Sequence, residues 1–209
     1  MQSQFSRTEL LLGNIVNSDA QMLSEGLSGL GLNVYWHTVV GDNPQRAREA
    51  VAIAKQRADI IITTGGLGPT CDDLTKNVLA EAFGKKLYFD EACAEHVRRH
   101  YHSTGRTMPE NNLQQAMLPE GCTVLVNDWG TAPGCAFEAE GIHVLMLPGP
   151  PFEMLTMLDR HVIPYLRNLS DEVIVSHDMD EIAENCTGAA VFSDGKVAIK
   201  ASPKQLFAT

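Results

Sequence analysis

The sequence predicts an α/β protein in three layers, a mostly parallel sheet with helices on both faces. Short apolar or β-branched runs alternate along the chain with amphipathic stretches of about 10 to 15 residues, the pattern of repeated strand–helix units. DIIIT at 59–63 contains a short continuous apolar run, which is typical of a strand buried on both faces of a parallel sheet. Apolar residues make up 44% of the 209, enough for a core.

The first elements follow from spacing and turn chemistry. Residues 1–7, MQSQFSR, are too polar and too short to make a good core strand. From Asn17 apolar residues recur every three or four positions, which predicts a helix that Asn17 or Ser18 can cap and Gly31 can end. NVYWHTVV at 33–40 is β-branched and aromatic, as strands are, and the turn at 41–44 ends in a proline suited to a first helical position. The next helix is marked by Ala47, Val51, Ala54 and Ala58.

The alternation continues to about residue 168. A helical stripe runs from Val78 to Phe83 and can end at Gly84, and a charged helix follows over about 90–103. Three short strands and a last helix are predicted at 123–127, 135–139, 143–148 and 151–165. We therefore expect one domain over 1–168, with 169–209 as an appendage too short to hold a core alone.

Composition restricts the classes of partner. The net charge of −10 argues against a nucleic-acid surface, which needs clustered Lys and Arg. The five cysteines include no C-x-x-C spacing, and we expect no metal on them. With no signal peptide and no apolar run near 18 residues, we expect a cytoplasmic protein without a membrane partner.

The stretch TTGGLGPTCDDLT at 63–75 places a glycine-rich turn between a strand and a helix. Glycines let the backbone approach a ligand and aim N–H groups at an anion, and the helix N-terminus favours phosphate. Asp72 and Asp73 would repel phosphate unless a hard divalent cation lies between them. The stretch therefore indicates a metal-bridged phosphate site. The alternative is a tight turn before a helix that one aspartate caps.

Six segments in order resemble the competence- and damage-inducible CinA family, whose fold is shared with molybdenum-cofactor biosynthesis proteins. They are TELLLGNIVNSDAQ (8–21), VVGDN (39–43), TTGGLGPTCDDLT (63–75), GRTMPENNLQQAMLPEG (105–121), NDWGTAPG (127–134) and LPGPPFEM (147–154). The resemblance implies a nucleotide pyrophosphatase that acts on ADP-ribose and related compounds with Mg²⁺, Mn²⁺ or Co²⁺. The related molybdenum-cofactor biosynthesis proteins bind molybdopterin at the equivalent loop. The alternative function is therefore a module that binds a pterin or nucleotide without catalysing a reaction.

The resemblance and the chemistry together suggest site residues. Asp72 and Asp73 are the candidate catalytic and metal-binding residues. The candidate phosphate and substrate contacts are Gly65, Gly66, Gly68, Thr70, Glu9, Asp42, Asn112, Thr131 and Gly149. Three of these have structural alternatives: Asp42 as a helix cap, Asn112 as a loop-stabilising amide, and Thr131 as a turn residue. We expect a small-molecule nucleotide substrate and a possible homo-oligomer.

Two regions depart from the family. Arg7 stands where the family has a glycine after its first strand. The tail at 172–207 resembles the C-terminal piece of ABC-transporter ATPases, with His177 in the switch position, then a short helix and strands around Asp194-Gly195. The chain nevertheless has no Walker A loop. A third hypothesis is therefore a rearranged chain with little activity. His96 and His100 lie one helical turn apart beside Arg98 and Arg99, which favours a solvated face over a metal site.

Overall fold

The computed structural model describes residues 2–6, 16–169, 189–193 and 196–201. The chain divides into two compact units, Met1–Arg167 and Asn168–Thr209. Helices on both faces of a mixed sheet form the first unit, as the sequence predicts. No helix in the described part of the chain is long and apolar enough to cross a membrane.

The sheet has the order β2-β1-β3-β8-β7-β6. Its first four strands are parallel, and the last two are antiparallel to their neighbours. The strands are β1 (Gln2–Ser6), β2 (Trp36–Val40), β3 (Ile60–Thr64), β6 (Thr123–Leu125), β7 (Gly134–Ala139) and β8 (Ile142–Leu147). A separate antiparallel pair joins β4 (Leu87–Phe89) to β5 (Met117–Pro119).

The expectation for residues 1–7 is wrong, because Gln2–Ser6 form the strand β1 between β2 and β3. The registers pair Gln4 with Thr38 on one side and with Thr63 on the other. Backbone hydrogen bonds to two neighbours do not depend on side-chain polarity, so pairing on both edges outweighs an unfavourable composition.

Three of the helices begin at a side chain that accepts a backbone N–H three residues on. Asn17 accepts from Ala20 before α2, as predicted, and Asp90 accepts from Cys93 before α5. Asn43, rather than Asp42, caps α3. The helices of this unit are α2 (Ser18–Ser28), α3 (Pro44–Lys55), α4 (Thr75–Ala82), α5 (Glu91–Thr104), the 3₁₀ helix η1 (Glu110–Ala116), α6 (Pro151–Met157), the π-helix η2 (Leu158–Val162) and α7 (Ile163–Arg167).

The helix predicted over 151–165 is continuous but contains the π turn η2. Pro164 follows this turn, and a proline has no N–H and collides with the carbonyl four residues before it. A wider turn ahead of the proline accommodates the ring without breaking the helix.

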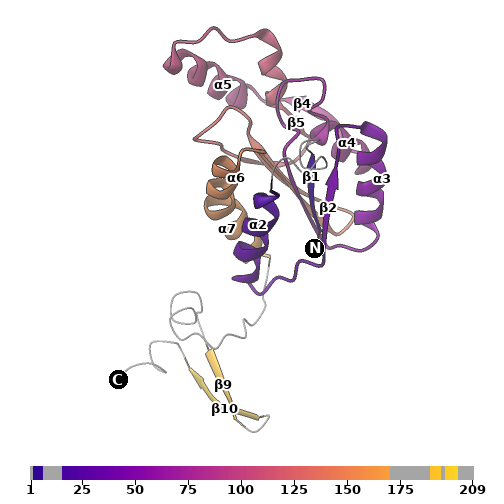
Figure 1. Ribbon diagram of the computed structural model, residues 1–209. Coiled ribbons are helices and arrows are strands. Elements are labelled where there is room, and N and C mark those ends of the chain that lie inside the picture. The colour runs from indigo at the N-terminus through magenta and orange to yellow at the C-terminus, as the bar shows by residue number, and fades with distance from the viewer. Residues whose placement is uncertain (1, 7–15, 170–188, 194–195, 202–209) are drawn as a thin grey trace. The chain divides into compact units, whose positions relative to one another are not determined.

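Side chains alternate between two cores along the central strands. Ile61 of β3 packs into the core under α3 and α4, whereas Ile62 packs into the core under α2, α6 and α7. On β8, Val144 and Met146 join the first core, and Leu145 joins the second. Figure 1 shows α3 and α4 on one side of the sheet and α2, α6 and α7 on the other.

In the second unit, β9 (Ala189–Ser193) and β10 (Lys196–Ala201) form an antiparallel pair, as expected around Asp194-Gly195. The short helix predicted for the tail and His177 lie outside the described residues.

Gly134→Ala should destabilise the first unit by about 1–3 kcal/mol, because an added methyl overpacks the core. Its Cβ would lie 2.7 Å from the backbone oxygen of Met146 and would collide with the sulfur of Met157. Urea unfolding monitored by circular dichroism measures the change. Gly29→Ala is the control, since the atom nearest to its added Cβ would be the Gly26 carbonyl oxygen at 3.6 Å, an ordinary contact distance. Equal midpoints for the two variants would contradict the prediction.

Candidate functional site

A cavity of about 390 Å³ opens where β2, β3 and β8 end. These strands belong to the parallel part of the sheet, so the loops after them meet at one edge. We call this the main cavity. It is lined by Asp42, Gly65, Gly66, Leu67, Gly68, Thr70, Asp72, Asp73, Gln115, Thr131, Ala132, Pro148, Gly149, Pro150 and Glu153.

The main cavity brings together every described candidate residue except Asn112. Glu9 lies outside the described residues. Asn112 is buried, accepts a hydrogen bond from the Tyr101 hydroxyl at 3.0 Å and donates to the Pro109 carbonyl at 3.3 Å. The geometry therefore favours the loop-stabilising alternative for Asn112.

The glycine turn needs its glycines. Gly65 and Gly66 have φ of 82° and 69°, a region that other residues rarely adopt. The Thr75 hydroxyl donates to the Gly65 carbonyl at 2.8 Å, and the Thr75 N–H donates to the Gly66 carbonyl at 3.2 Å. A Cβ on Gly66 would collide with that hydroxyl, so the start of α4 closes directly against the turn.

Asp73 is held by the loop that precedes it. Its Oδ2 accepts from the Thr70 N–H at 2.9 Å and from the Thr70 hydroxyl at 2.5 Å. A Cβ on Gly68 would lie 2.5 Å from the same oxygen, so Gly68 leaves the space that the carboxylate occupies. Thr70 thus positions Asp73, a role that the sequence did not suggest.

Neither aspartate caps α4, whose N-cap is Leu74 with no side-chain hydrogen bond. The capped-helix alternative is therefore wrong. Asp72 is exposed, and its Oδ1 accepts a weak bond from the Cys71 thiol at 3.7 Å. Both aspartates line the same cavity as the glycine turn.

Two polar residues in the cavity wall were not predicted. Gln115, from η1, is 4% exposed, and its Oε1 has no hydrogen-bond partner among the described residues. Glu153, from α6, contributes a further carboxylate. Both lie inside segments that carry the family resemblance, but no spacing rule distinguishes them there from turn and core residues.

Lys76 is a buried cation behind the cavity wall. Its Nζ donates to the carbonyls of Gln114 and Gln115, each at 3.0 Å. Burial lowers the pKa of Lys76 to about 8, and nearby Cys135 and Asp73 act in the opposite direction. Losing its third proton leaves a neutral amine with two N–H donors, enough for both carbonyls.

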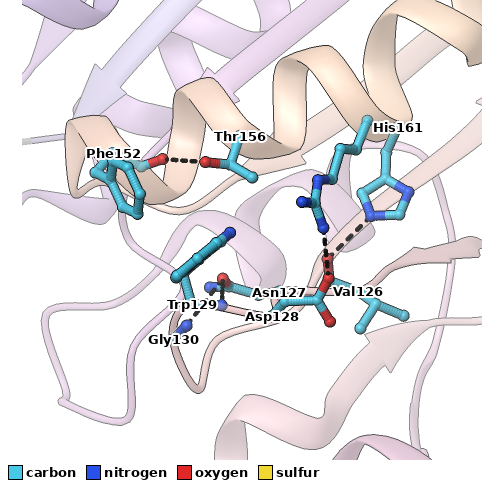
Figure 2. Close-up of polar contacts among 9 residues, drawn as sticks. Val126, Asn127, Asp128, Trp129, Gly130, Phe152, Thr156 and His161 are labelled. Carbon is cyan, nitrogen blue, oxygen red and sulfur yellow. Dashed lines mark hydrogen bonds and ion pairs between the residues drawn. The ribbon is translucent and has the colours of Figure 1, made fainter.

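A buried amide fixes the loop at 127–132 (Figure 2). The Oδ1 of Asn127 accepts from the N–H groups of Trp129 and Gly130 at 3.1 and 3.0 Å. Its Nδ2 donates to the Ala132 carbonyl at 3.0 Å and to Glu153 Oε2 at 2.6 Å. All hydrogen-bonding positions of this amide are used, so Asn127 couples the loop to Glu153.

The described residues contain no group of three or more His, Cys, Asp or Glu that could hold a metal ion. His96 is half-buried with its Nε2 3.1 Å from the Gly130 carbonyl oxygen, so it supports the loop and is not part of a solvated face. Asp72 and Asp73 still suit Mg²⁺, which is usually bound by one or two carboxylates together with substrate phosphates and water.

Comparison with known proteins assigns the family. The family described as a probable molybdopterin binding domain matches residues 7–168. A crystal structure of the protein CinA from Thermoplasma acidophilum, itself described as of unknown function, superposes with a TM-score of 0.69 at 31% identity. It covers 76% of this chain and 92% of that one. The chain belongs to the CinA family. The MoaB enzyme of molybdopterin biosynthesis from Thermus thermophilus has a TM-score of 0.54 at 19% identity over 80% of this chain and 91% of that one, which shows the fold alone.

Longer CinA relatives match as well. A putative competence-damage inducible protein of Acetivibrio thermocellus is 45% identical over 214 residues, covering 94% of this chain and 52% of the relative. A CinA-like protein of Dictyoglomus turgidum is 49% identical over 169 residues, covering 81% and 41%. The chain thus spans about half the length of the curated relatives it matches. A coverage of 94% includes part of the tail, so the resemblance of the tail to transporter ATPases is unsupported.

Stability should depend on pH through Lys76. Between the folded pKa of about 8 and the unfolded value of 10.5, the unfolded chain binds more protons, so stability rises with pH. Wild type should therefore gain about 1 kcal/mol relative to Lys76→Met between pH 7 and 9. Urea unfolding of both proteins at both pH values gives the change in unfolding free energy with pH for each. Subtracting the change for Lys76→Met from that for wild type removes the contribution of the other titrating groups. Parallel pH profiles would contradict the assignment.

Asn127→Asp should destabilise the protein by about 2–4 kcal/mol, because it removes two buried donors and faces Glu153 with a second acid. Thermal and urea unfolding measure the loss. Asp128→Asn is the neighbouring control, since its ion pair with Arg160 at 3.1 Å is exposed and contributes little. A similar loss in both variants would show that the amide network is not what holds the loop.

Proposed function

We propose that this chain binds a nucleotide diphosphate of the ADP-ribose or nucleotide-sugar type in the main cavity and hydrolyses its phosphoanhydride bond with a divalent cation. The observation that supports this most directly is that the glycine turn, Asp72 and Asp73 line one cavity of about 390 Å³. An amide cradle and two carboxylates share a diphosphate only when a cation balances the negative charges.

In the proposed reaction, the glycine turn would bind phosphate and the two aspartates would hold the cation. The positive φ of Gly65 and Gly66 brings the backbone of the turn close to the cavity, where the N–H groups that follow Gly65 would donate to phosphate oxygens. Thr70 fixes Asp73 Oδ2, which leaves Oδ1 of the same carboxylate to bind the cation together with Asp72. A bound divalent cation would neutralise charge on the diphosphate and lower the pKa of the attacking water.

Two further residues complete the proposed site. Asn127 holds Glu153 Oε2 at 2.6 Å, so Glu153 Oε1 is the candidate acceptor for a proton from water. The buried Oε1 of Gln115 has no partner among the described residues, so it would accept a hydrogen bond from a ribose hydroxyl.

A second candidate function is binding of a pterin or nucleotide without chemistry. Two observations favour it: the described residues hold no preformed three-ligand metal cluster, and the matching family is described as a probable molybdopterin binding domain. Calorimetry would then show ligand binding that Mg²⁺ does not change, with no product.

Incubation with ADP-ribose and Mg²⁺, Mn²⁺ or Co²⁺ should release AMP, measured by liquid chromatography. Asp72→Asn and Asp73→Asn should each reduce kcat/KM by on the order of 100-fold or more, because each removes charge that holds the cation. Asp159→Asn, an exposed aspartate outside the main cavity, is the matched control. Absence of AMP with all three metals, while ADP still binds, would leave the binding module as the function.

A further inference from the structure

A second cavity, of about 220 Å³, shares wall residues with the main cavity. Thr131 and Glu153 line both. We call it the side cavity; its other lining residues are His100, Tyr101, Thr104, Arg106, Trp129 and Gly130. A ligand in the main cavity therefore has a neighbouring space that α5 and the loop at 127–132 enclose.

Trp129 gives the side cavity an aromatic wall. The side chain is 51% exposed, although an indole is usually more buried. Asn127 accepts the backbone N–H of Trp129, and the Phe152 ring meets the indole at 5.2 Å between centroids and 74°. Figure 2 shows the indole beside Phe152, above the Asn127 network. The exposed indole therefore offers a flat surface on which a planar ring can stack.

Arg106 gives the side cavity a positive charge. The guanidinium makes no ion pair or hydrogen bond with the residues that the structure describes, in a chain of net charge −10. Arginine and tryptophan together bind planar rings, by stacking and by hydrogen bonds to ring nitrogens or to an adjacent phosphate. The remaining wall is largely polar, which suits a heterocycle better than an apolar protein surface.

We propose that the side cavity binds the planar base of a nucleotide whose phosphates occupy the main cavity, with the base stacked on Trp129 and contacted by Arg106. The inference rests on the proposed function for the phosphate end only. Because Thr131 and Glu153 line both cavities, the two spaces are adjacent, and a ligand that occupies both is a nucleotide rather than a free diphosphate or a sugar phosphate.

Tryptophan fluorescence tests this directly, because the chain has two tryptophans. The full chain carrying Trp36→Phe reports on Trp129 alone. ADP should quench its emission with saturation, whereas pyrophosphate should compete with ADP without quenching. By calorimetry, Trp129→Ala should weaken ADP binding about 10-fold or more while pyrophosphate binding stays unchanged. Arg106→Gln should weaken ADP binding in the same direction, and Trp36→Phe is the control that should not.

Several outcomes would overturn the inference: equal quenching by ADP and pyrophosphate, an ADP affinity unchanged in Trp129→Ala, or no ADP binding at all. A different result would place the indole between two copies of the chain. In that case the Trp129 emission would be blue-shifted without ligand, would change with protein concentration and would not respond to ADP. The AMP-release assay separates this inference from the proposed function. If Trp129→Ala hydrolyses ADP-ribose as well as wild type does, only the proposed base site is rejected. If ADP binding depends on Trp129 but no AMP is released, only the proposed hydrolase activity is rejected.

Discussion

One backbone hydrogen bond, from the Gly65 N–H to the Leu147 carbonyl at 3.0 Å, fixes the site to the sheet. It extends the pairing of β3 with β8 one residue beyond the strand, and the chain then turns through two positive φ angles. The turn begins at a residue that is hydrogen-bonded to the neighbouring strand. The loop carrying Asp72 and Asp73 is therefore anchored at its start to the central strands. The loop after β8, with Pro148 and Gly149, meets it across the same bond.

Charge arrangement is the second constraint on the site. Asp42, Asp72, Asp73 and Glu153 line the main cavity, and Lys76 is a buried cation that interacts electrostatically with Asp73. Its ammonium group donates to two backbone carbonyls rather than to a carboxylate. The cavity is therefore rich in negative charge, so the proposed binding of a diphosphate would need a cation from solution to balance the repulsion.

Much of the fold could be predicted because it depends on local patterns. The continuous apolar run in DIIIT and the helical spacing from Asn17 are visible in the sequence, and both elements form close to the expected residues. The glycine turn was also predictable, because positive φ favours glycine. The strand at Gln2–Ser6 was not, since its stability comes from two neighbours distant in the chain.

Within the site, the residues that sequence reasoning missed act through tertiary contacts. Gln115 belongs to a 3₁₀ segment whose burial only the assembled fold determines, and Glu153 matters because Asn127, from another loop, holds it. The Thr70 hydroxyl was assigned to phosphate because no pattern shows that Asp73 folds back to accept it. The sequence therefore predicted which kinds of side chain the site contains, but not which residues hydrogen-bond to one another.

The close approach of Gly68 to Asp73 limits how this loop can change over generations. A Cβ at position 68 would lie 2.5 Å from the carboxylate oxygen, so a side chain there would push the Asp73 carboxylate out of its present place. The hydrogen bonds that Asp73 accepts from Thr70 would be lost with that movement. Retention of the acid in this orientation over evolution therefore favours glycine at position 68.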